Sequence, residues 1–489
     1  MHLTMASYAD EKAGYQPLAD ADGNDTHQTP TGRKLTLLQR AQQEEQQTQQ
    51  KTSPASLALR IVGLVALTML LGVHLLAGRL HGHGHGSCHR SLTVEERVDR
   101  ILTGTPLIDG HNDFPIFIRE AFNNHINNET FRNGFERDGL PMHVDLPRLR
   151  AGKNGGAFWS VFTPCPKNGS DFSDGNYVDS VRDTLLQIDL VARLKTAYPD
   201  VFSPNLDSAA ALPAFERGQL ISPLGIEGLH QIGNSVSNLR LYHALGVRYA
   251  TLTHNCPNIY ADAALWEGPF RKAPKLWDGL SPLGRKVVHE MNRVGLIIDL
   301  SHTSVDTMED VLGGRPDEAQ HWNGSLAPVI FSHSSAHSIC PHPRNVPDHV
   351  LQLVKQRGGV VMVNFSPDFV SCHWTGSPEE KNGVPTYFPG NATLEHVATH
   401  VLYIGKLIGF DHVGFGSDFD GIFSTPRGLG DVAAYPALVA ELLRRGVTDE
   451  EAAKVVGGNV LRVWREVDAV AAKMQAAGVP PLEDDPAQL

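Results

Sequence analysis

Eight short apolar runs, separated by longer segments with a helical pattern, constrain the fold of this 489-residue chain more than any other feature. They follow one another from about residue 95, and near-continuous apolar runs are typical of parallel strands that are buried on both faces. Helices are predicted between them, at Val178–Tyr198, Pro282–Val294, Val346–Arg357 and Leu394–Ile408. The predicted strands are PLIDGHND (106–113), FWSVFTP (158–164), LISPLGIEG (220–228), RYATLTHN (248–255), GLIIDLSH (295–302), PVIFSHSS (328–335), GVVMVNFS (359–366) and HVGFGSDFD (412–420).

This alternation predicts a (β/α)8 barrel of the TIM type, with insertions, over residues 95–470, followed by a tail at 471–489. A doubly wound open sheet is the alternative, but no glycine-rich phosphate loop of the GxGxxG or GxxxxGK[ST] kind is present to favour it. The net charge of −12 argues against a nucleic-acid partner, because no basic stripe is available to neutralise phosphates.

The segment before the barrel has a different composition. Residues 1–56 are polar and rich in Gln, Thr, Asp and Lys, so we expect a disordered cytoplasmic segment. Residues 57–78 contain the apolar run Ile61–Ala77, which is long enough to cross about 30 Å of hydrocarbon as a transmembrane signal anchor; a buried core helix is the alternative. Residues 79–94, with their HGHGHG sequence, are interpreted as a flexible Gly/His linker.

Side chains that bind metals fall at the carboxyl ends of six of the eight predicted strands, where parallel barrels place their active sites. Two strands carry pairs spaced by two residues, and strand geometry predicts that both members of each pair face the same side. Imidazole and carboxylate ligands without cysteine suit Zn²⁺, with Mn²⁺ or Co²⁺ as alternatives, and the set is too large for one tetrahedral ion. A two-metal site is therefore predicted. The candidate ligands are His111 with Asp113, Glu227, His302, His333, and Asp418 with Asp420, and His254 ends another of these strands as a candidate for substrate binding.

Three positions also have simpler interpretations. Glu227 lies between glycines and, taken alone, could be a turn or helix-capping acid. His254 could hydrogen-bond an oxyanion, but a buried structural histidine is an equal alternative. Arg344 follows the sixth strand and could hold a carboxylate, although a loop arginine is usually just solvated.

Eight ordered motifs make the chain resemble the membrane (renal-type) dipeptidases, a family of metallo-dependent hydrolases. The motifs are IDGHNDFP, GGAFWSVFTPC, GIEG, LTHN, IDLSHTS, FSHSSAHSIC, RNVPD and VGFGSDFDG, and the likeness covers residues 97–465. The resemblance implies a zinc-dependent dipeptidase in which water or hydroxide held between two zinc ions per chain attacks the peptide carbonyl of a small peptide.

The resemblance also implies a role for each site residue. On this basis the first zinc is bound by His111 and Asp113, the second by His302 and His333, and Glu227 bridges the two. In the same way, the catalytic and substrate-binding residues are Asp418 as the acid/base group, His254 as the group that stabilises the tetrahedral intermediate, and Arg344 as the partner of the substrate's C-terminal carboxylate.

Five widely spaced cysteines without a CxxC pair exclude zinc ribbons and thioredoxin-type motifs, but leave both free thiols and disulfides open. The resemblance implies that Cys165 pairs with Cys256 and Cys340 with Cys372, which leaves Cys88 unmatched, with an intermolecular bridge as one possibility. Because disulfides require an oxidising compartment, we expect a single-pass type II membrane protein with an extracellular or luminal catalytic domain.

Glycosylation sequons agree with that location. They occur at Asn128, Asn168, Asn323 and Asn391, whereas the Asn364 sequon lies on a predicted buried strand and is expected to stay unmodified. The C-terminal sequence PPLEDDPAQL has no hydrophobic end, so no GPI anchor is expected.

Two other functions remain open at this point. The same chemistry could serve cysteinyl-glycine conjugates derived from glutathione rather than ordinary dipeptides. The other hypothesis is a non-catalytic barrel that binds partners at the cell surface. The complete set of candidate metal ligands argues against it. The resemblance also allows a homodimer, although no interface can be assigned from the sequence.

Overall fold

Eight parallel strands form one sheet in the computed structural model, which describes residues 92–205, 207–317 and 321–484. The strand order is β1-β2-β3-β4-β7-β8-β9-β12, so each strand of the sheet pairs with the one that follows it in the chain. The predicted mixed α/β fold with a parallel eight-stranded barrel is therefore confirmed. The strands are β1 Leu107–Asn112, β2 Asn154–Ser160, β3 Leu224–Glu227, β4 Val247–Thr251, β7 Ile297–Asp299, β8 Ile330–Phe331, β9 Val360–Val363 and β12 Val413–Phe415.

The sheet is closed by contacts between β1 and the segment that follows β12. Asn112 and Phe419 form a parallel bridge. The amide of Asp113 donates to the carbonyl of Phe419 at 2.8 Å, and the amide of Asp418 donates to the carbonyl of His111 at 3.1 Å. These bonds bring the last strand back beside the first, so that the carboxyl ends of all eight strands face one mouth.

Two buried aspartates join neighbouring strands just below the mouth. The carboxylate of Asp109 on β1 accepts hydrogen bonds from the amide and hydroxyl of Ser417, at 2.8 and 2.6 Å, and so ties β1 to β12. Asp299 on β7 accepts in the same way from Ser332, and also from the hydroxyl of Thr251 at the end of β4. Both acids therefore act as structural acceptors that hold adjacent strand ends in register.

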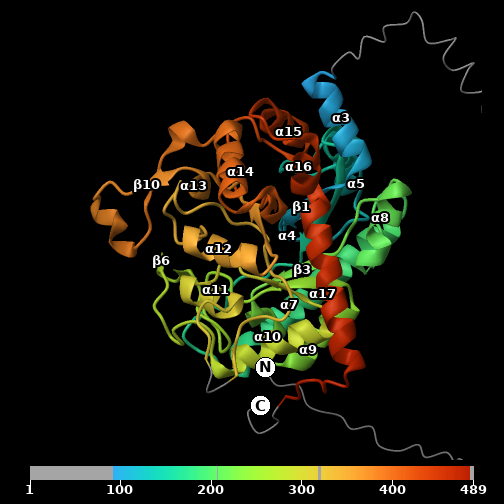
Figure 1. Ribbon diagram of the computed structural model, residues 1–489. Coiled ribbons are helices and arrows are strands. Elements are labelled where there is room, and N and C mark those ends of the chain that lie inside the picture. The colour runs from blue at the N-terminus through green and yellow to red at the C-terminus, as the bar shows by residue number, and fades with distance from the viewer. Residues whose placement is uncertain (1–91, 206, 318–320, 485–489) are drawn as a thin grey trace, which may run out of the picture. The chain divides into compact units, whose positions relative to one another are not determined.

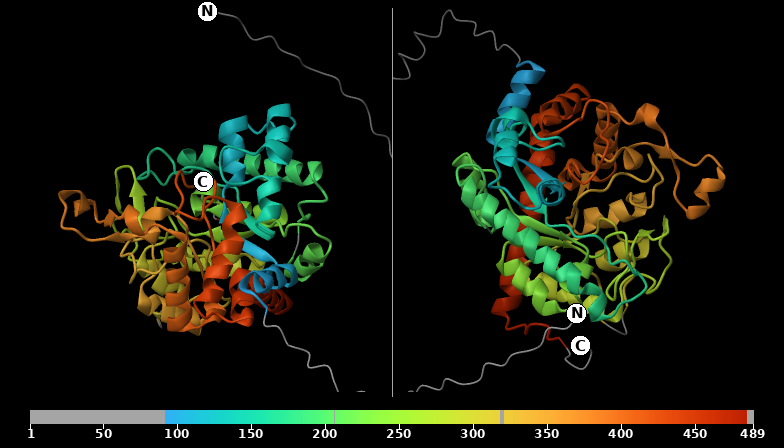
Figure 2. Two further views of the ribbon diagram at one scale, coloured as in Figure 1. Left: turned by 90° about the horizontal axis from the view of Figure 1, so that it is seen from above. Right: turned by 180° about the vertical axis from the view of Figure 1, so that it is seen from behind.

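Helices surround the sheet, as Figures 1 and 2 show. Helix α10 (Pro282–Val294) illustrates why they form where they do. The Ser281 side chain caps its first turn, Pro282 fits the first helical position, and Gly295 ends it with φ of 88°. The other long helices are α3 Val94–Gly104, α4 Phe114–Phe122, α7 Asp174–Ala197, α8 Ser208–Glu216, α9 Val236–Ala244, α11 Val305–Leu312, α12 Asp348–Gln356, α14 Leu394–Ile408, α15 Tyr435–Arg444 and α17 Asn459–Ala476.

Several predicted boundaries were wrong by a few residues. Strand β2 begins four residues before the predicted FWSVFTP segment, and β12 ends at Phe415 rather than at residue 420. The predicted helix Val178–Tyr198 begins at Asp174, and the predicted helix 346–357 spans 348–356. The strands end early because the chain turns at the mouth: His302, Asp418 and Asp420 all have positive φ, between 64° and 67°, which is incompatible with a strand.

The chain outside the barrel is described only in part. The predicted segment 1–56, the anchor at 57–78 with Ile61–Ala77, and all of the linker before residue 92 lie outside the described residues. Within the described ranges, every helix is too short or too polar to cross a bilayer. At the other end, α17 continues past the boundary drawn at residue 470, and the Asp484 carboxylate accepts from the first amides of α9.

Replacing Asp109 by alanine should lower the free energy of unfolding by about 2–4 kcal/mol, because two buried donors of Ser417 lose their acceptor. Chemical unfolding of both proteins measures this difference. Asp179→Ala is the control, since that side chain is 78% exposed and its loss should change stability by less than about 0.5 kcal/mol. Equal stability of the Asp109 variant and the parent would contradict this account of barrel closure.

Candidate active site

The predicted metal-binding side chains cluster at the mouth of the barrel, and Asp113, Glu227 and His302 among them line a cavity of about 790 Å³. Its walls come from segments far apart in the sequence, each following a different strand. Because the strands are parallel and closed into a ring, their carboxyl ends converge on this space. The cavity is lined, among others, by Asp113, Glu227, His254, His302, Arg344 and Asp418.

Glu227, at the end of β3, is the centre of the cluster. Its Oε2 lies 3.6 Å from Nε2 of His111, whereas its Oε1 lies 2.9 Å from Nε2 of His302 and 3.3 Å from Nε2 of His333. The carboxylate is only 4% exposed. One oxygen therefore faces one group of ligands and the other oxygen faces a second group, which is the arrangement that a bridging carboxylate needs.

The first group contains two carboxylates as well as an imidazole. Nε2 of His111 lies 3.1 Å from Oδ2 of Asp113, so the prediction that these two side chains face the same side is confirmed. Potential ligand atoms of His111, Asp113 and Asp418 lie within 4.8 Å of one another. Within the described part of the chain, the second carboxylate oxygen of Asp113 is buried without a hydrogen-bond partner, and so it keeps lone pairs free for a cation.

Each of the three histidines is held through its Nδ1 atom, which leaves Nε2 to face Glu227. Such a contact fixes the ring orientation and tautomer of a metal-binding histidine. Asn255 and Ser332 stand next to predicted site residues, but Tyr249 lies within β4, and nothing in the local sequence marks it as part of the site. The pairs are His111 with the Tyr249 hydroxyl at 2.6 Å, His302 with Asn255 Oδ1 at 2.8 Å, and His333 with the Ser332 hydroxyl at 2.7 Å.

The electrostatics of the cluster favour a bound cation. Burial lowers the pKa of His302 and of His333 well below the usual value, so both rings are neutral and keep a lone pair. Burial raises the pKa of Glu227 well above its usual value. Burial would also lower the pKa of His111, but the Asp113 and Glu227 carboxylates outweigh it and raise this pKa to about 10. Positive charge is therefore stabilised between these carboxylates, and the donor set fits divalent metal ions.

Asp418 is the third acid of the cluster. Its Oδ2 accepts a hydrogen bond from Nδ2 of Asn364 at 3.2 Å. Burial, reinforced by the nearby charge of Asp113 against the opposing effect of His111, raises the pKa of Asp418 to about 7. Asn364 is fully buried, which agrees with the expectation that its sequon is not used.

Asp418 and Asp420 line the same cavity, but Asp420 is not among the side chains whose potential ligand atoms cluster with His111 and Asp113. Oδ1 of Asp420 accepts from the amide of His143 at 2.7 Å, and the Asp420 amide donates to Nδ1 of His143 at 2.9 Å. The positive φ of both aspartates breaks the two-residue periodicity on which the prediction depended. Asp420 therefore clamps the loop after β12 to the loop that carries His143.

Arg344 is buried, with 1% of its surface exposed, and the alternative of a solvated loop arginine is wrong. Its guanidinium lies 5.2 Å from the centre of the Phe369 ring, and Nη1 reaches the Ser334 hydroxyl at 3.5 Å. Nε and Nη2 have no hydrogen-bond partner among the residues that the structure describes. Burial lowers the pKa of Arg344 to about 10, so the group keeps its charge at neutral pH. A buried cation with unpaired donors that lines the cavity fits a carboxylate ligand.

His254 lies on the side of the cavity next to His302, with 4.4 Å between the ring centres. Its Nδ1 lies 3.5 Å from Oε1 of Glu267 and 3.6 Å from Sγ of Cys165. Glu267 ends the short strand β5 (Leu265–Glu267) in the insertion between β4 and β7. This proximity could not be predicted, because Glu267 lies outside every motif.

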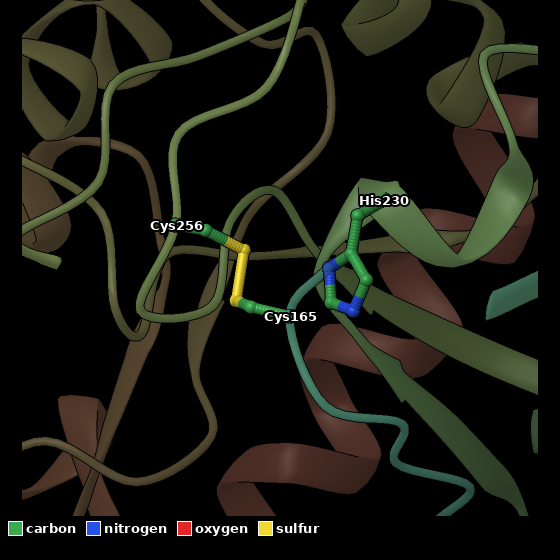
Figure 3. A group of neighbouring side chains, drawn as sticks. All are labelled: Cys165, His230 and Cys256. Carbon is green, nitrogen blue, oxygen red and sulfur yellow. A yellow bond between two sulfur atoms is a disulfide. The ribbon is translucent and has the colours of Figure 1, made fainter. Parts of the chain in front are cut away.

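Both disulfides implied by the family resemblance, Cys165–Cys256 and Cys340–Cys372, are present. Figure 3 shows His230 beside the Cys165–Cys256 disulfide. The potential ligand atoms of these three residues lie within 4.8 Å of one another, a spacing that could hold a metal ion. The sulfur atoms are bonded to each other, however, and Nε2 of His230 donates to the Thr163 carbonyl at 3.0 Å, with its pKa lowered to about 4 by burial. This neighbouring cluster is therefore structural.

A parallel barrel with histidines and carboxylates at its mouth is an architecture of metal-dependent hydrolases. Comparison with known proteins also indicates a metal-dependent hydrolase. Residues 95–478 match the family described as membrane dipeptidase (peptidase family M19). The chain is 45% identical over 390 residues to the dipeptidase aclJ of Aspergillus oryzae, covering 79% of this chain and 84% of that protein. It is 43% identical over 423 residues to an uncharacterized dipeptidase of Schizosaccharomyces pombe, covering 85% and 93%.

Solved structures share the fold. The probable dipeptidase PvdM from Pseudomonas aeruginosa superposes with a TM-score of 0.64 at 24% identity, over 77% of this chain and 99% of that one. A metallopeptidase from Rhodobacter sphaeroides, solved with a phosphinate mimic of L-Ala-D-Ala, gives 0.59 at 24% identity, over 74% and 99%. The chain belongs to the membrane dipeptidase family. It is a dipeptidase-type hydrolase, and membership of this metallopeptidase family implies a divalent metal ion, typically zinc.

Replacing Tyr249 by phenylalanine should weaken metal binding by about 10- to 100-fold, because Nδ1 of His111 loses the hydroxyl that holds the ring. The measurement is the zinc concentration that half-restores dipeptidase activity after removal of metal with a chelator. Tyr198→Phe is the control, since its hydroxyl contacts Glu136 at 3.0 Å away from the cavity. An unchanged zinc requirement would show that the Tyr249 contact is dispensable.

Proposed function

We propose that this protein hydrolyses dipeptides with two zinc ions held at the mouth of the barrel. His111 and Asp113 would bind the first ion and His302 and His333 the second, with Glu227 bridging both. One observation carries the proposal: the two oxygens of the Glu227 carboxylate face different sets of imidazole nitrogens, at 2.9–3.6 Å. A single ion could be bound by the imidazole nitrogens on only one side of Glu227, and those on the other side would have no metal to bind.

The two ions would supply Lewis acidity for the scissile carbonyl and lower the pKa of water enough to give a nucleophile near neutral pH. The protein supplies the rest. Asp418 borders the first ligand group and is fixed by Asn364, so it is placed to accept the proton of the attacking water and to return it to the leaving amine. His254, which lines the cavity beside His302, is placed to hydrogen-bond the oxyanion that develops on the carbonyl.

Arg344 would select substrates by their length. Its unpaired Nε and Nη2 donors can form two parallel hydrogen bonds with a free carboxylate. Holding the C-terminal carboxylate at a fixed distance from the metal-binding cluster limits hydrolysis to the bond one residue away. A longer peptide would place an uncharged amide against a buried cation, which costs binding free energy.

Metal content tests the two-ion proposal directly. The purified holoprotein should contain two zinc ions per chain, and a chelator should abolish hydrolysis reversibly. Glu227→Gln should reduce the zinc content to below one ion per chain, because both ligand groups lose a charged oxygen. Glu450→Gln is the matched control, with a side chain that is 83% exposed. A fully active protein with a single ion would contradict the bridging role of Glu227.

Substitutions at two residues should separate chemistry from binding. Asp418→Asn should lower kcat by at least about 100-fold with little change in KM, because the proton carrier is lost. Arg344→Ala should chiefly raise KM, and Arg344→Lys should be intermediate because lysine keeps the charge without the paired donors. Steady-state kinetics with a simple dipeptide such as Gly-Ala measure both. Normal turnover by the Asp418→Asn protein would refute its assigned role.

The location of the barrel is also part of the proposal: a type II membrane protein anchored by residues 57–78, with the barrel extracellular or luminal. The two disulfides support an oxidising compartment, and the four sequons at exposed asparagines are compatible with it. The full-length chain should remain in the membrane fraction after an alkaline carbonate wash, and deletion of residues 57–78 should release it. Release of the full-length chain by the same wash would contradict the anchor.

A further inference from the structure

Phe423 is the most exposed large apolar side chain among the described residues, at 98%, against 63% for Val178, the next in that group. Isolated exposed apolar side chains are common and need no explanation by themselves. Phe423 differs because it lines the active-site cavity, on the loop that follows β12. An aromatic ring that is fully solvated beside a substrate cavity has apolar surface available for whatever enters.

The loop that carries Phe423 runs directly against the metal-binding cluster. Even a single methyl group at Gly421 would collide with the Asp113 carboxylate and come within 2.7 Å of Asp418 Oδ1. Consecutive Cα atoms are about 3.8 Å apart, so the Cα of Phe423 lies within about 8 Å of that of Gly421. The phenyl ring is therefore within reach of a side chain on the residue whose carbonyl is attacked.

Phe423 continues an apolar wall built from three segments. Ile116 and Phe117 come from the first turn of α4, Met142 comes from the loop before α6 (Leu146–Ala151), and Ile422 precedes Phe423; all of them line the cavity. The reciprocal hydrogen bonds between His143 and Asp420 join the second and third segments. This clamp fixes the wall before any substrate binds.

The wall and Arg344 belong to different parts of the rim. The wall follows β1 and β12, whereas Arg344 follows β8, and β9 separates β8 from β12 in the sheet. A dipeptide with its carboxylate at Arg344 and its carbonyl at the cluster would place its N-terminal side chain toward the remaining part of the cavity. The volume of about 790 Å³ lies in the range of cavities that bind drug-sized ligands, so a large side chain has room.

We propose that Ile116, Phe117, Met142, Ile422 and Phe423 form a subsite for a large apolar side chain on the N-terminal residue of the dipeptide, with Phe423 as a specificity-determining residue. This inference rests on the proposed dipeptide hydrolysis and adds the class of substrate to it. Contact with such a side chain removes the Phe423 ring and the substrate's apolar surface from water together. Small N-terminal residues cannot make this contact.

Dipeptides that differ only in the N-terminal residue test the subsite. The parent enzyme should cleave Phe-Gly with a kcat/KM at least tenfold above that for Gly-Gly, which is the discrimination expected of an apolar pocket. Phe423→Ala should lower kcat/KM for Phe-Gly by about tenfold and change that for Gly-Gly by less than twofold. Because the ring is exposed in the free protein, this substitution does not threaten folding. Phe270→Ala, at a 52% exposed phenylalanine on β6 (Phe270–Lys272) outside the cavity, is the matched control.

The possible outcomes distinguish this inference from the function on which it rests. If Phe423→Ala leaves the Phe-Gly to Gly-Gly ratio unchanged while both dipeptides are cleaved, the subsite is wrong and the dipeptidase proposal stands. Equal loss on both substrates would likewise overturn the specificity role, because it indicates a general effect on the loop. Failure of the zinc-loaded parent to cleave any dipeptide would refute the proposed function itself.

Discussion

The burial of one carboxylate between two sets of imidazole nitrogens is the constraint on which the site depends. Glu227 is almost inaccessible to water, and burial raises the pKa of its carboxyl well above the usual value. Such a group is stable as an anion only beside positive charge. The neutral His302 and His333 lie on one side of this carboxylate and His111 with Asp113 on the other, so the cluster offers lone pairs and negative charge to a divalent metal ion.

That arrangement requires a closed barrel. The candidate ligands lie at or just after the ends of strands β1, β3, β7 and β8, and the return of the segment after β12 to β1 closes the ring in which they meet. The buried carboxylates of Asp109 and Asp299 accept hydrogen bonds that stabilise the strand ends. These two acidic residues near the mouth therefore have a structural role. The same closure places Gly421 against Asp113, and with it the loop that carries Phe423.

The parts of the site that the sequence predicted share one property: they sit at the ends of strongly apolar strands or in recognisable motifs. The strand geometry assumed for Asp418 and Asp420 was wrong, because the chain has already left the sheet there with positive φ. Tyr249 and Glu267 could not be predicted, since one occupies an ordinary strand position and the other lies in an irregular insertion. Their contacts with His111 and His254 exist only after the chain has folded.

By itself the sequence determined the type of fold, the candidate ligands at the strand ends and the family, because apolar periodicity and short motifs are local properties of the chain. Only the tertiary structure decided which oxygen of Glu227 faces which histidine, that Arg344 is buried with unpaired donors, and that Phe423 is solvated at the rim. The physical reason is that burial and distance depend on segments hundreds of residues apart, which closure of the barrel brings together at one mouth.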